Sequence, residues 1–259
     1  MVKKVLSIIL WVVTGAALIA LFVFGHKWYM ETSLKGVSCT IERSRANGFV
    51  EEDSIIAHAK VICNTEHQAA ISTVDMMKIK SMLEGNPWIA QSSAYIRLDD
   101  TLHIRIREYE PLLRVYNHDG SSVYLTHEGN IIPSSPHFTP HLIIASGHYN
   151  FARPSKNAKV SDSLYLQSGL AEALAIAKAI GKDQYLKDHI GQIYKNNDNE
   201  YEIIVNNLPV QVILGDTCAV ENKLYRLKVL LEKYHGTVEL EAYKTMNLKY
   251  KNQIVCTKK

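Results

Sequence analysis

The sequence predicts an α+β fold with a single N-terminal transmembrane helix, a β-α-α-β-β domain, and a mixed, mostly antiparallel β domain with two helices. Three observations predict this fold. An uncharged apolar run lies near the N-terminus, alternating strands meet at an acidic turn before residue 110, and short strands separated by turn residues follow residue 111. We therefore divide the chain into a tail (1–4), a transmembrane helix (5–24), a linker (25–34), a first domain (35–110) and a β domain (111–259).

The apolar run VLSIILWVVTGAALIALFVF covers residues 5–24 without a charged side chain. As a helix it rises about 30 Å, which matches the hydrocarbon core of a bilayer. A cleaved signal peptide is the alternative, but the run is longer than usual and no small-x-small site follows it. Lys3 and Lys4 place the N-terminus in the cytoplasm, so the bulk of the chain is expected to be periplasmic or extracytoplasmic. We expect Trp28 and Tyr29 at the membrane–water interface.

Composition argues against several classes of function. The net charge of +3 is small for 259 residues, and the basic side chains are scattered, so we predict no nucleic-acid binding. The four cysteines lie far apart without a C-x-x-C pair, which disfavours a zinc ribbon or a redox motif. Free buried thiols and disulfides both remain possible for Cys39, Cys63, Cys218 and Cys256.

The first domain begins with a strand over residues 37–42, followed by a helix over 50–62 with acidic residues in its first turn. A second helix is predicted to open at Ser72 and to run to Gly85, because Ser72 and Asp75 match a capping box. Helices of this kind pack on one face of a small sheet.

A hairpin closes the first domain. In its first arm Ala94, Ile96 and Leu98 share one face, and the turn is expected at Asp99-Asp100. In the second arm, alternation predicts three residues that face the helices: Leu102, Ile104 and Ile106.

In the β domain, helices are predicted over 163–180 and 220–234. The second has an inward apolar stripe and an outward charged face. The inward residues are Leu224, Leu227, Leu230 and Leu231, and the outward ones are Lys223, Arg226, Lys228 and Glu232.

A search for chemistry assigns no catalytic residue, metal ligand, cofactor or small-molecule substrate. The sequence lacks G-x-S-x-G, G-x-G-x-x-G, Walker A and H-E-x-x-H motifs. Weaker candidates are better explained otherwise: loop histidines, a helix-terminal thiol and a solvated sheet rim. These candidates are His137, His141 and His148 for a metal, Cys63 with His58 or His67 for a nucleophile, and Glu108 with Glu110 for acid–base work.

Several short motifs in order resemble the cell-division family FtsQ/DivIB. They are NPW, T-L-x-I-x-I and E-x-x-P in the hairpin, then LTHEGNIIP, VILGDTCAVENKLYRLKVLLEKY and MNLKY. The resemblance spans residues 1 to about 256. The sequence departs from the family pattern at the turn, where Asp99 replaces a common proline, and in the D-L-R-Y strand, where Asn247 and Lys249 replace the charged pair.

The resemblance implies that the first domain is a POTRA domain and that the chain is a non-enzymatic bitopic scaffold at the division septum. It also implies partners of the FtsB/FtsL type, which are single-pass coiled-coil proteins, and a link to the septal peptidoglycan synthase. Two alternatives remain: an envelope POTRA protein for secretion or outer-membrane assembly, and a membrane-tethered envelope hydrolase.

Finally, we predict that the segment from Tyr243 to Cys256 is an exposed edge strand that binds a partner. In the resembled family the D-L-R-Y strand accepts a partner strand by β-augmentation. Lysines that merely protect an edge from unwanted pairing are the alternative. The candidate partner-binding residues are Tyr243, Met246, Asn247, Leu248, Lys249, Tyr250 and Lys251.

Overall fold

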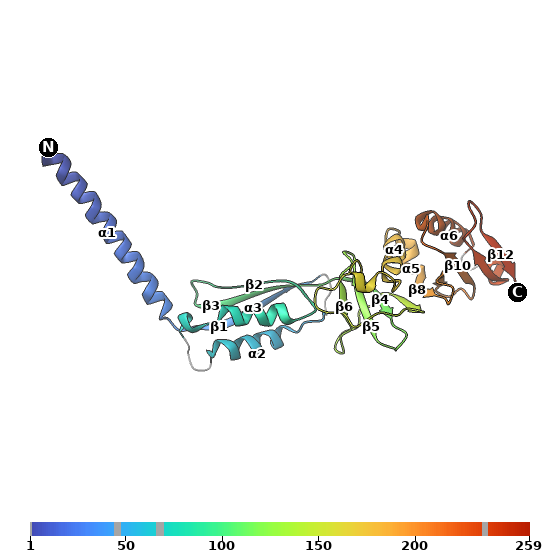
Figure 1. Cartoon of the computed structure of the whole chain (residues 1–259), viewed down its shortest axis with the longest axis horizontal. Coiled ribbons are helices and arrows are strands. Elements are labelled where there is room, and N and C mark those ends of the chain that lie inside the picture. The colour runs from blue at the N-terminus through green and yellow to red at the C-terminus, as the bar shows by residue number, and fades with distance from the viewer. Residues whose placement is uncertain (1, 44–47, 66–69, 235–237) are drawn as a thin grey trace. The chain divides into compact units, whose positions relative to one another are not determined.

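The computed structural model describes residues 2–43, 48–65, 70–234 and 238–259. The chain forms two compact units, Met1–Glu108 and Tyr109–Lys259. The predicted fold class is confirmed: an apolar N-terminal helix is followed by a small α+β layer pair and a large mixed sheet with helices (Figure 1).

Helix α1 (Val2–Met30) contains the apolar run and continues past Phe24. Its segment Ile9–Met30 is long and apolar enough to cross a membrane, with a mean hydropathy of 2.1. Trp28 is exposed, as expected of an interfacial residue. Tyr29 instead packs against the core of the first unit, so only one of this aromatic pair faces outward from the unit.

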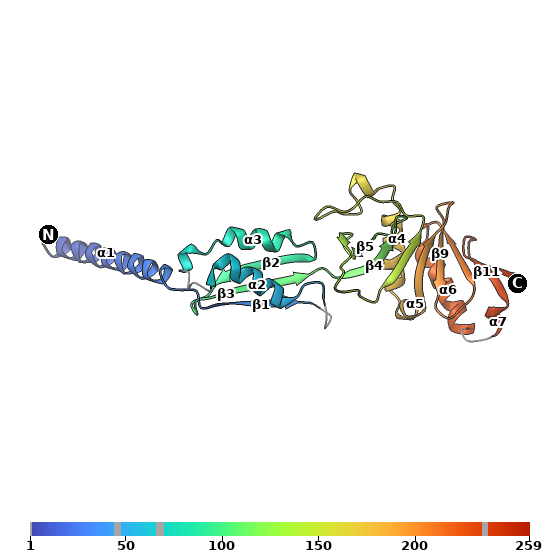
Figure 2. The same ribbon diagram turned by 90° about the horizontal axis from the view of Figure 1, so that it is seen from below.

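The first unit is built on a mixed sheet of three described strands in the order β1-β3-β2. Strand β1 (Gly36–Glu42) is parallel to β3 (Thr101–Glu108), and β2 (Ile89–Ile96) is antiparallel to it. Helices α2 (Glu52–Cys63) and α3 (Met76–Gly85) lie along one face of this sheet (Figure 2). The strand alternation is confirmed, because Leu102, Ile104 and Ile106 are buried between sheet and helices.

The turn between β2 and β3 corrects the position of Leu98. Strand β2 ends at Ile96, and the Asp100 N–H donates to the Arg97 carbonyl (3.0 Å), so residues 97–100 form a β-turn. Asp100 has φ 61°, the left-handed conformation that closes such a loop. Leu98 therefore stands exposed in the turn rather than on the buried face with Ala94 and Ile96.

The predicted start of the second helix is wrong. A short 3₁₀ turn, η2 (Ile71–Thr73), comes first, and α3 begins at Met76. Asp75 is itself the N-cap, since its carboxylate accepts a hydrogen bond from the Lys78 N–H (3.0 Å). The Ser72–Asp75 capping box is thus absent because the chain bends out of the helix between these residues.

Glu108 does not belong to a solvated rim. Its carboxylate is buried and accepts hydrogen bonds from the N–H groups of Phe49 (3.2 Å) and Val50 (3.0 Å), and Arg43 Nη1 lies 3.3 Å away. It therefore ties the end of β3 to the segment that precedes α2. Glu110 is exposed, so the two carboxylates have different environments.

The second unit is a mixed sheet of nine described strands in the order β12-β11-β10-β9-β8-β7-β4-β5-β6. Helices α4, α5 and α6 share one core with it. The strands are β4 (Pro111–Tyr116), β5 (Ser122–Thr126), β6 (Ile131–Pro133), β7 (Ile143–Gly147), β8 (Ile190–Lys195), β9 (Tyr201–Val205), β10 (Gln211–Gly215), β11 (Tyr243–Asn247) and β12 (Val255–Lys258). The helices are α4 (Leu170–Gly181), α5 (Gln184–His189), α6 (Val220–Tyr234) and α7 (Val238–Glu241).

Two expectations for these helices need correction. The segment 163–180 is divided into a 3₁₀ turn, η3 (Ser163–Tyr165), and α4, because Gly169 takes φ 84° between them. Lys223 on α6 is buried rather than outward. Its ammonium donates to the Asp216 carboxylate (2.6 Å) and to the Asp216 carbonyl (2.9 Å), which satisfies the buried charge.

Candidate partner-binding site

The predicted edge strand from Tyr243 to Cys256 is two strands, which is a correction. Strand β11 pairs with β10 on one side, in parallel, and with β12 on the other, in antiparallel orientation. Strand β12 ends the sheet in the described part of the chain. The edge that can accept another strand therefore belongs to β12, whereas β11 is internal.

The seven predicted partner-binding residues fall into two groups. Met246 and Leu248 are fully buried and anchor β11 and the following turn to the core. The others are partly or fully exposed: Tyr243, Asn247, Lys249, Tyr250 and Lys251.

Arg226 on α6 holds the turn that connects β11 to β12. Its Nη1 donates to the carbonyls of Tyr250 (2.7 Å) and Gln253 (2.5 Å), and its Nη2 donates to the carbonyl of Leu248 (3.0 Å). A planar guanidinium suits this task because its donors form a fixed fork. The sequence placed Arg226 on the outward face of α6 and did not signal this role, since the turn lies far away along the chain.

Lys249 fixes the same turn from the side of β10. Its Nζ lies 2.5 Å from the Glu200 carboxylate, a hydrogen-bonded ion pair that raises the pKa of Lys249. The aliphatic stem of Lys249 crosses Gly215, where an added Cβ would lie 2.6 Å from its Cγ. Gly215 also has φ 78°, so both the backbone conformation and the close approach require glycine.

The backbone of β12 directs its peptide groups alternately toward β11 and away from it. The Lys259 N–H donates inward to the Ala242 carbonyl of the neighbouring segment (3.0 Å). Because the peptide groups of a strand alternate in direction, those of Thr257 also face β11, and those of Cys256 and Lys258 face away from it. The outward groups form the row to which a partner strand would bind.

The opposite edge of the same sheet is covered. At the start of β6, the Ile131 N–H donates to the Ala158 carbonyl (2.8 Å), and the preceding residue Asn130 forms an antiparallel backbone β-bridge with Lys159. Strand β6 also ends in Pro133, which has no N–H to offer. The sheet of the second unit thus presents β12 as its accessible edge.

A polar cluster lies on the sheet of the first unit. Ser38 Oγ lies 2.9 Å from His103 Nδ1, and His103 Nε2 lies 3.3 Å from the Asp99 carboxylate. The His103 ring also stacks on Tyr95, with 5.8 Å between ring centroids. These residues form one row across three strands on the solvent side of the sheet, which is ordinary cross-strand stabilisation. Alternation on strands without knowledge of their pairing could not reveal this row.

The histidine and cysteine candidates differ in their exposure. His137, His141 and His148 are all exposed, and His148 Nδ1 lies 3.4 Å from the Lys195 carbonyl oxygen. Among the described residues, no group of three His, Cys, Asp or Glu side chains is placed to hold a metal ion. All four cysteines are free thiols; Cys39 and Cys63 are buried, Cys218 is exposed and Cys256 is intermediate. His67 lies outside the described residues.

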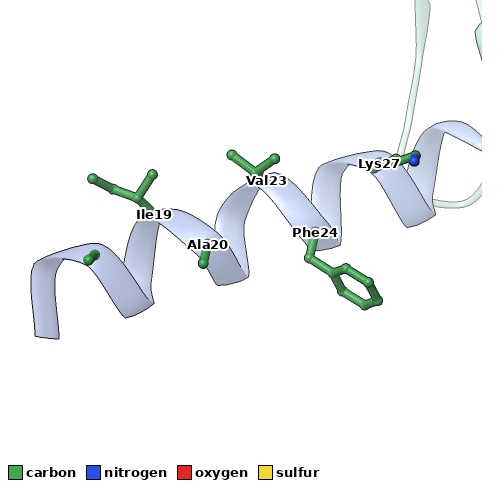
Figure 3. A pocket seen from close by; sticks show the side chains of 6 residues that line it. Ile19, Ala20, Val23, Phe24 and Lys27 are labelled. Carbon is green, nitrogen blue, oxygen red and sulfur yellow. The ribbon is translucent and has the colours of Figure 1, made fainter. Parts of the chain in front are cut away.

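Along α1, the surface is apolar and open. Figure 3 shows Ile19, Ala20, Val23 and Phe24 on this helix, with Lys27 farther along toward its C-terminal end. Such a surface is suited to lipid, because its side chains are apolar and uncovered. The residues that line this side are Ala16, Ile19, Ala20, Val23, Phe24 and Lys27.

Comparison with known proteins identifies the family. The family described as FtsQ/DivIB, C-terminal related, matches residues 110–257, which cover the second unit from β4 to the penultimate residue of β12. No curated protein matches the chain. The family is one of non-enzymatic division scaffolds, and it suggests a role in cell division for a membrane-anchored protein. The chain belongs to the FtsQ/DivIB family.

Proposed function

We propose that this protein is a non-enzymatic, single-pass membrane scaffold that links FtsB/FtsL-type coiled-coil proteins to septal peptidoglycan synthesis. The observation that carries the proposal is the open edge of β12, held in place by Arg226 on a unit that matches the FtsQ/DivIB family. A scaffold needs a preorganised docking surface and no reactive centre.

The proposed topology places the N-terminus in the cytoplasm and both folded units outside it, at the division septum. Lys3 and Lys4 support this orientation. An alkaline phosphatase fused after Lys259 should then be active, and a fluorescent fusion should form a midcell band. A diffuse envelope signal would favour a secretion-type POTRA protein instead.

The proposed docking mode is addition of a partner strand to β12. The outward peptide groups of Cys256 and Lys258 supply main-chain hydrogen bonds, which give affinity without strict sequence requirements. Selectivity must come from nearby side chains. Tyr250 is half exposed and Val255 is also exposed, so both can contact an added partner strand.

Tyr250 is the proposed side-chain anchor. Its backbone is fixed by Arg226, so little additional order is required on binding. Truncation of an aromatic anchor at an interface costs on the order of 2 kcal/mol, which corresponds to about 30-fold in affinity. Leu248 and Met246 contribute indirectly, because they are buried and hold the turn and β11 to the core.

The test is capture of a detergent-solubilised FtsB/FtsL-type partner by the full chain and its variants. Lys258→Pro removes an outward N–H, whereas Lys258→Ala removes the same side chain and keeps that N–H. We expect proline to abolish capture and alanine to retain it, with equal melting curves. Equal capture by both variants would exclude strand addition at this edge.

A further inference from the structure

The exposed apolar side chains of the first unit gather at one end of the domain. Outside α1, the large hydrophobic side chains that are exposed in the described part of this unit are Val61, Met77, Tyr95 and Leu98. Three are almost fully exposed, at 81% for Val61, 74% for Met77 and 89% for Leu98. Isolated exposed apolar residues need no explanation, but a one-sided distribution does.

The topology shows that these three belong to the same end. Leu98 lies in the turn that precedes β3. Helix α2 begins beside the far end of β3, where Glu108 binds the Val50 N–H, and runs back so that Val61 lies in its last turn. Met77 lies in the first turn of α3, and this helix begins at the same end of the domain as Leu98 and Val61. Figure 2 shows both helices lying along the strands.

This end is also the one that is attached to α1. The Tyr29 hydroxyl donates to the Arg97 carbonyl (2.8 Å), directly before Leu98. The Ile71 N–H donates to the Thr32 carbonyl (2.9 Å), which ties η2 to the residues that follow the helix. A third contact joins Lys35 to Asp100. The Lys35 N–H donates to the Asp100 carbonyl (2.8 Å), and the Lys35 ammonium lies 2.8 Å from the Asp100 carboxylate.

These contacts fix the position of Leu98 relative to the end of α1. Side chains on a helix point back toward its N-terminus, so the Tyr29 hydroxyl lies nearer the membrane than the Tyr29 Cα. The Arg97 carbonyl that it binds is therefore level with the last turn of α1, which contains Trp28 and Lys27. Trp28 is an exposed residue of the kind that settles at the headgroup level, so Leu98 follows within reach of the same layer.

We propose that this end of the first unit rests on the bilayer that α1 crosses, with Leu98, Val61 and Met77 inserted into its interfacial layer. The occupant is lipid because this end is hydrogen-bonded to the last turn of α1, whose apolar side chains are exposed along the membrane-spanning segment. Arg97 and Lys60 lie beside the apolar residues and can extend toward headgroups while their stems stay in the interface. Asp75, Asp99 and Asp100 lie at the same end, so anionic lipid is not required.

The contact would fix the orientation of the POTRA-like unit on the membrane surface. A single transmembrane helix alone leaves an attached domain free to tilt. Added insertion points on separate elements restrict that tilt, because α2, α3 and the β2–β3 turn would each contact the interface.

The test uses site-directed spin labels on the full chain in phosphatidylethanolamine–phosphatidylglycerol vesicles. Cys218→Ser and Cys256→Ser remove the accessible thiols, and the buried Cys39 and Cys63 remain. Labels are placed in separate variants at positions 61, 77 and 98. The matched control is Glu84→Cys, an exposed position in the last turn of α3, at the opposite end of the helix that carries Met77.

Relaxation by oxygen, which dissolves in lipid, is compared with relaxation by a water-soluble nickel chelate. We expect a several-fold higher oxygen-to-nickel ratio at positions 61, 77 and 98 than at position 84. In a second variant, Leu98→Asp should lower the ratio at position 77, with no change in melting because Leu98 is exposed. Equal ratios at all four positions would overturn the proposal. An oxygen-to-nickel ratio at positions 61, 77 and 98 that falls when the lipid-to-protein ratio is raised would also overturn the proposal. Such a fall would mean that a second copy of the chain, diluted by the added lipid, had covered these side chains.

Discussion

Arg226→Ala is expected to increase local opening of β12 without unfolding the second unit. The guanidinium bonds three carbonyls of the turn that carries β12, at Leu248, Tyr250 and Gln253. A buried hydrogen bond to a charged group contributes about 1.5–3 kcal/mol, but two of these bonds are solvent-exposed and hold a flexible side chain in place. We therefore expect a total of about 2 kcal/mol, or about 30-fold in the local opening equilibrium.

The assay is amide hydrogen exchange of the full chain in detergent. The reporters are the Leu248 N–H, which bonds the Ile213 carbonyl (2.8 Å), and the inward N–H groups of β12. The protection factors of these N–H groups should fall about 30-fold, while the protection of amides in strands such as β8 stays unchanged. Arg226→Lys should recover only part of the loss, because an ammonium cannot present the same fork of donors.

Tyr225→Ala is the matched control, since Tyr225 neighbours Arg226 and is largely exposed. It should leave the protection of β12 within a few tenths of a kcal/mol of wild type. Unchanged protection in Arg226→Ala would refute the reasoning, because the ladder with β11 would then hold β12 without help from α6.

Three further predictions concern the core, the ion pair between the buried Lys223 and the exposed Asp216, and the thiols. Ile104→Asp should destabilise the first unit by more than about 4 kcal/mol, because an unpaired carboxylate enters its apolar layer. The control Ile104→Val should lower the free energy of unfolding by only about 1 kcal/mol, and calorimetry measures both losses. The hydrogen bond from Lys223 lowers the pKa of the Asp216 carboxyl below its usual value of 3.8. The ionised Asp216 therefore contributes its full stabilisation of the fold above pH 3.8, and this stabilisation is lost as the pH falls through the lowered pKa. Denaturation of wild type and Asp216→Asn should therefore converge in acid and differ at neutral pH. A maleimide should modify the exposed Cys218 rapidly and spare Cys39 in the folded chain, because burial raises the pKa of Cys39 to about 11.

Local periodicity was sufficient to predict much of the fold. The twenty-residue apolar run, the alternation around Ile104 and the leucine stripe of α6 each bury or expose side chains at a fixed spacing. Those patterns depend on neighbours within one element, so they can be recognised without knowing how elements pair.

Features that depend on pairing were missed for a physical reason. Glu108 appeared solvated because its partners, the N–H groups of Phe49 and Val50, lie far back in the chain. Lys223 appeared outward because its charge is satisfied by Asp216, which precedes the helix. Long polar side chains can be buried wherever a distant partner compensates their charge, and composition does not show that partner.

The candidate partner-binding site was also predicted only as far as local patterns allow. The sequence located the correct C-terminal region, but it joined β11 and β12 into one strand because Met246, Leu248, Tyr250 and Ile254 fall on even positions. The turn between them interrupts the ladder, and Asn252 takes φ 58° within it. Asparagine tolerates that conformation, so Asn252 was the local signal for the turn.

The most direct test of the central claim is residue-resolved amide exchange of the full chain with and without an FtsB/FtsL-type partner. In the free chain the inward N–H groups of Thr257 and Lys259 should already be protected, and the outward groups of Cys256 and Lys258 should exchange rapidly. Partner binding should protect Cys256 and Lys258 and leave the inward pair little changed. Protection that appears elsewhere on the chain, with Cys256 and Lys258 still exchanging rapidly in the complex, would contradict strand addition at β12.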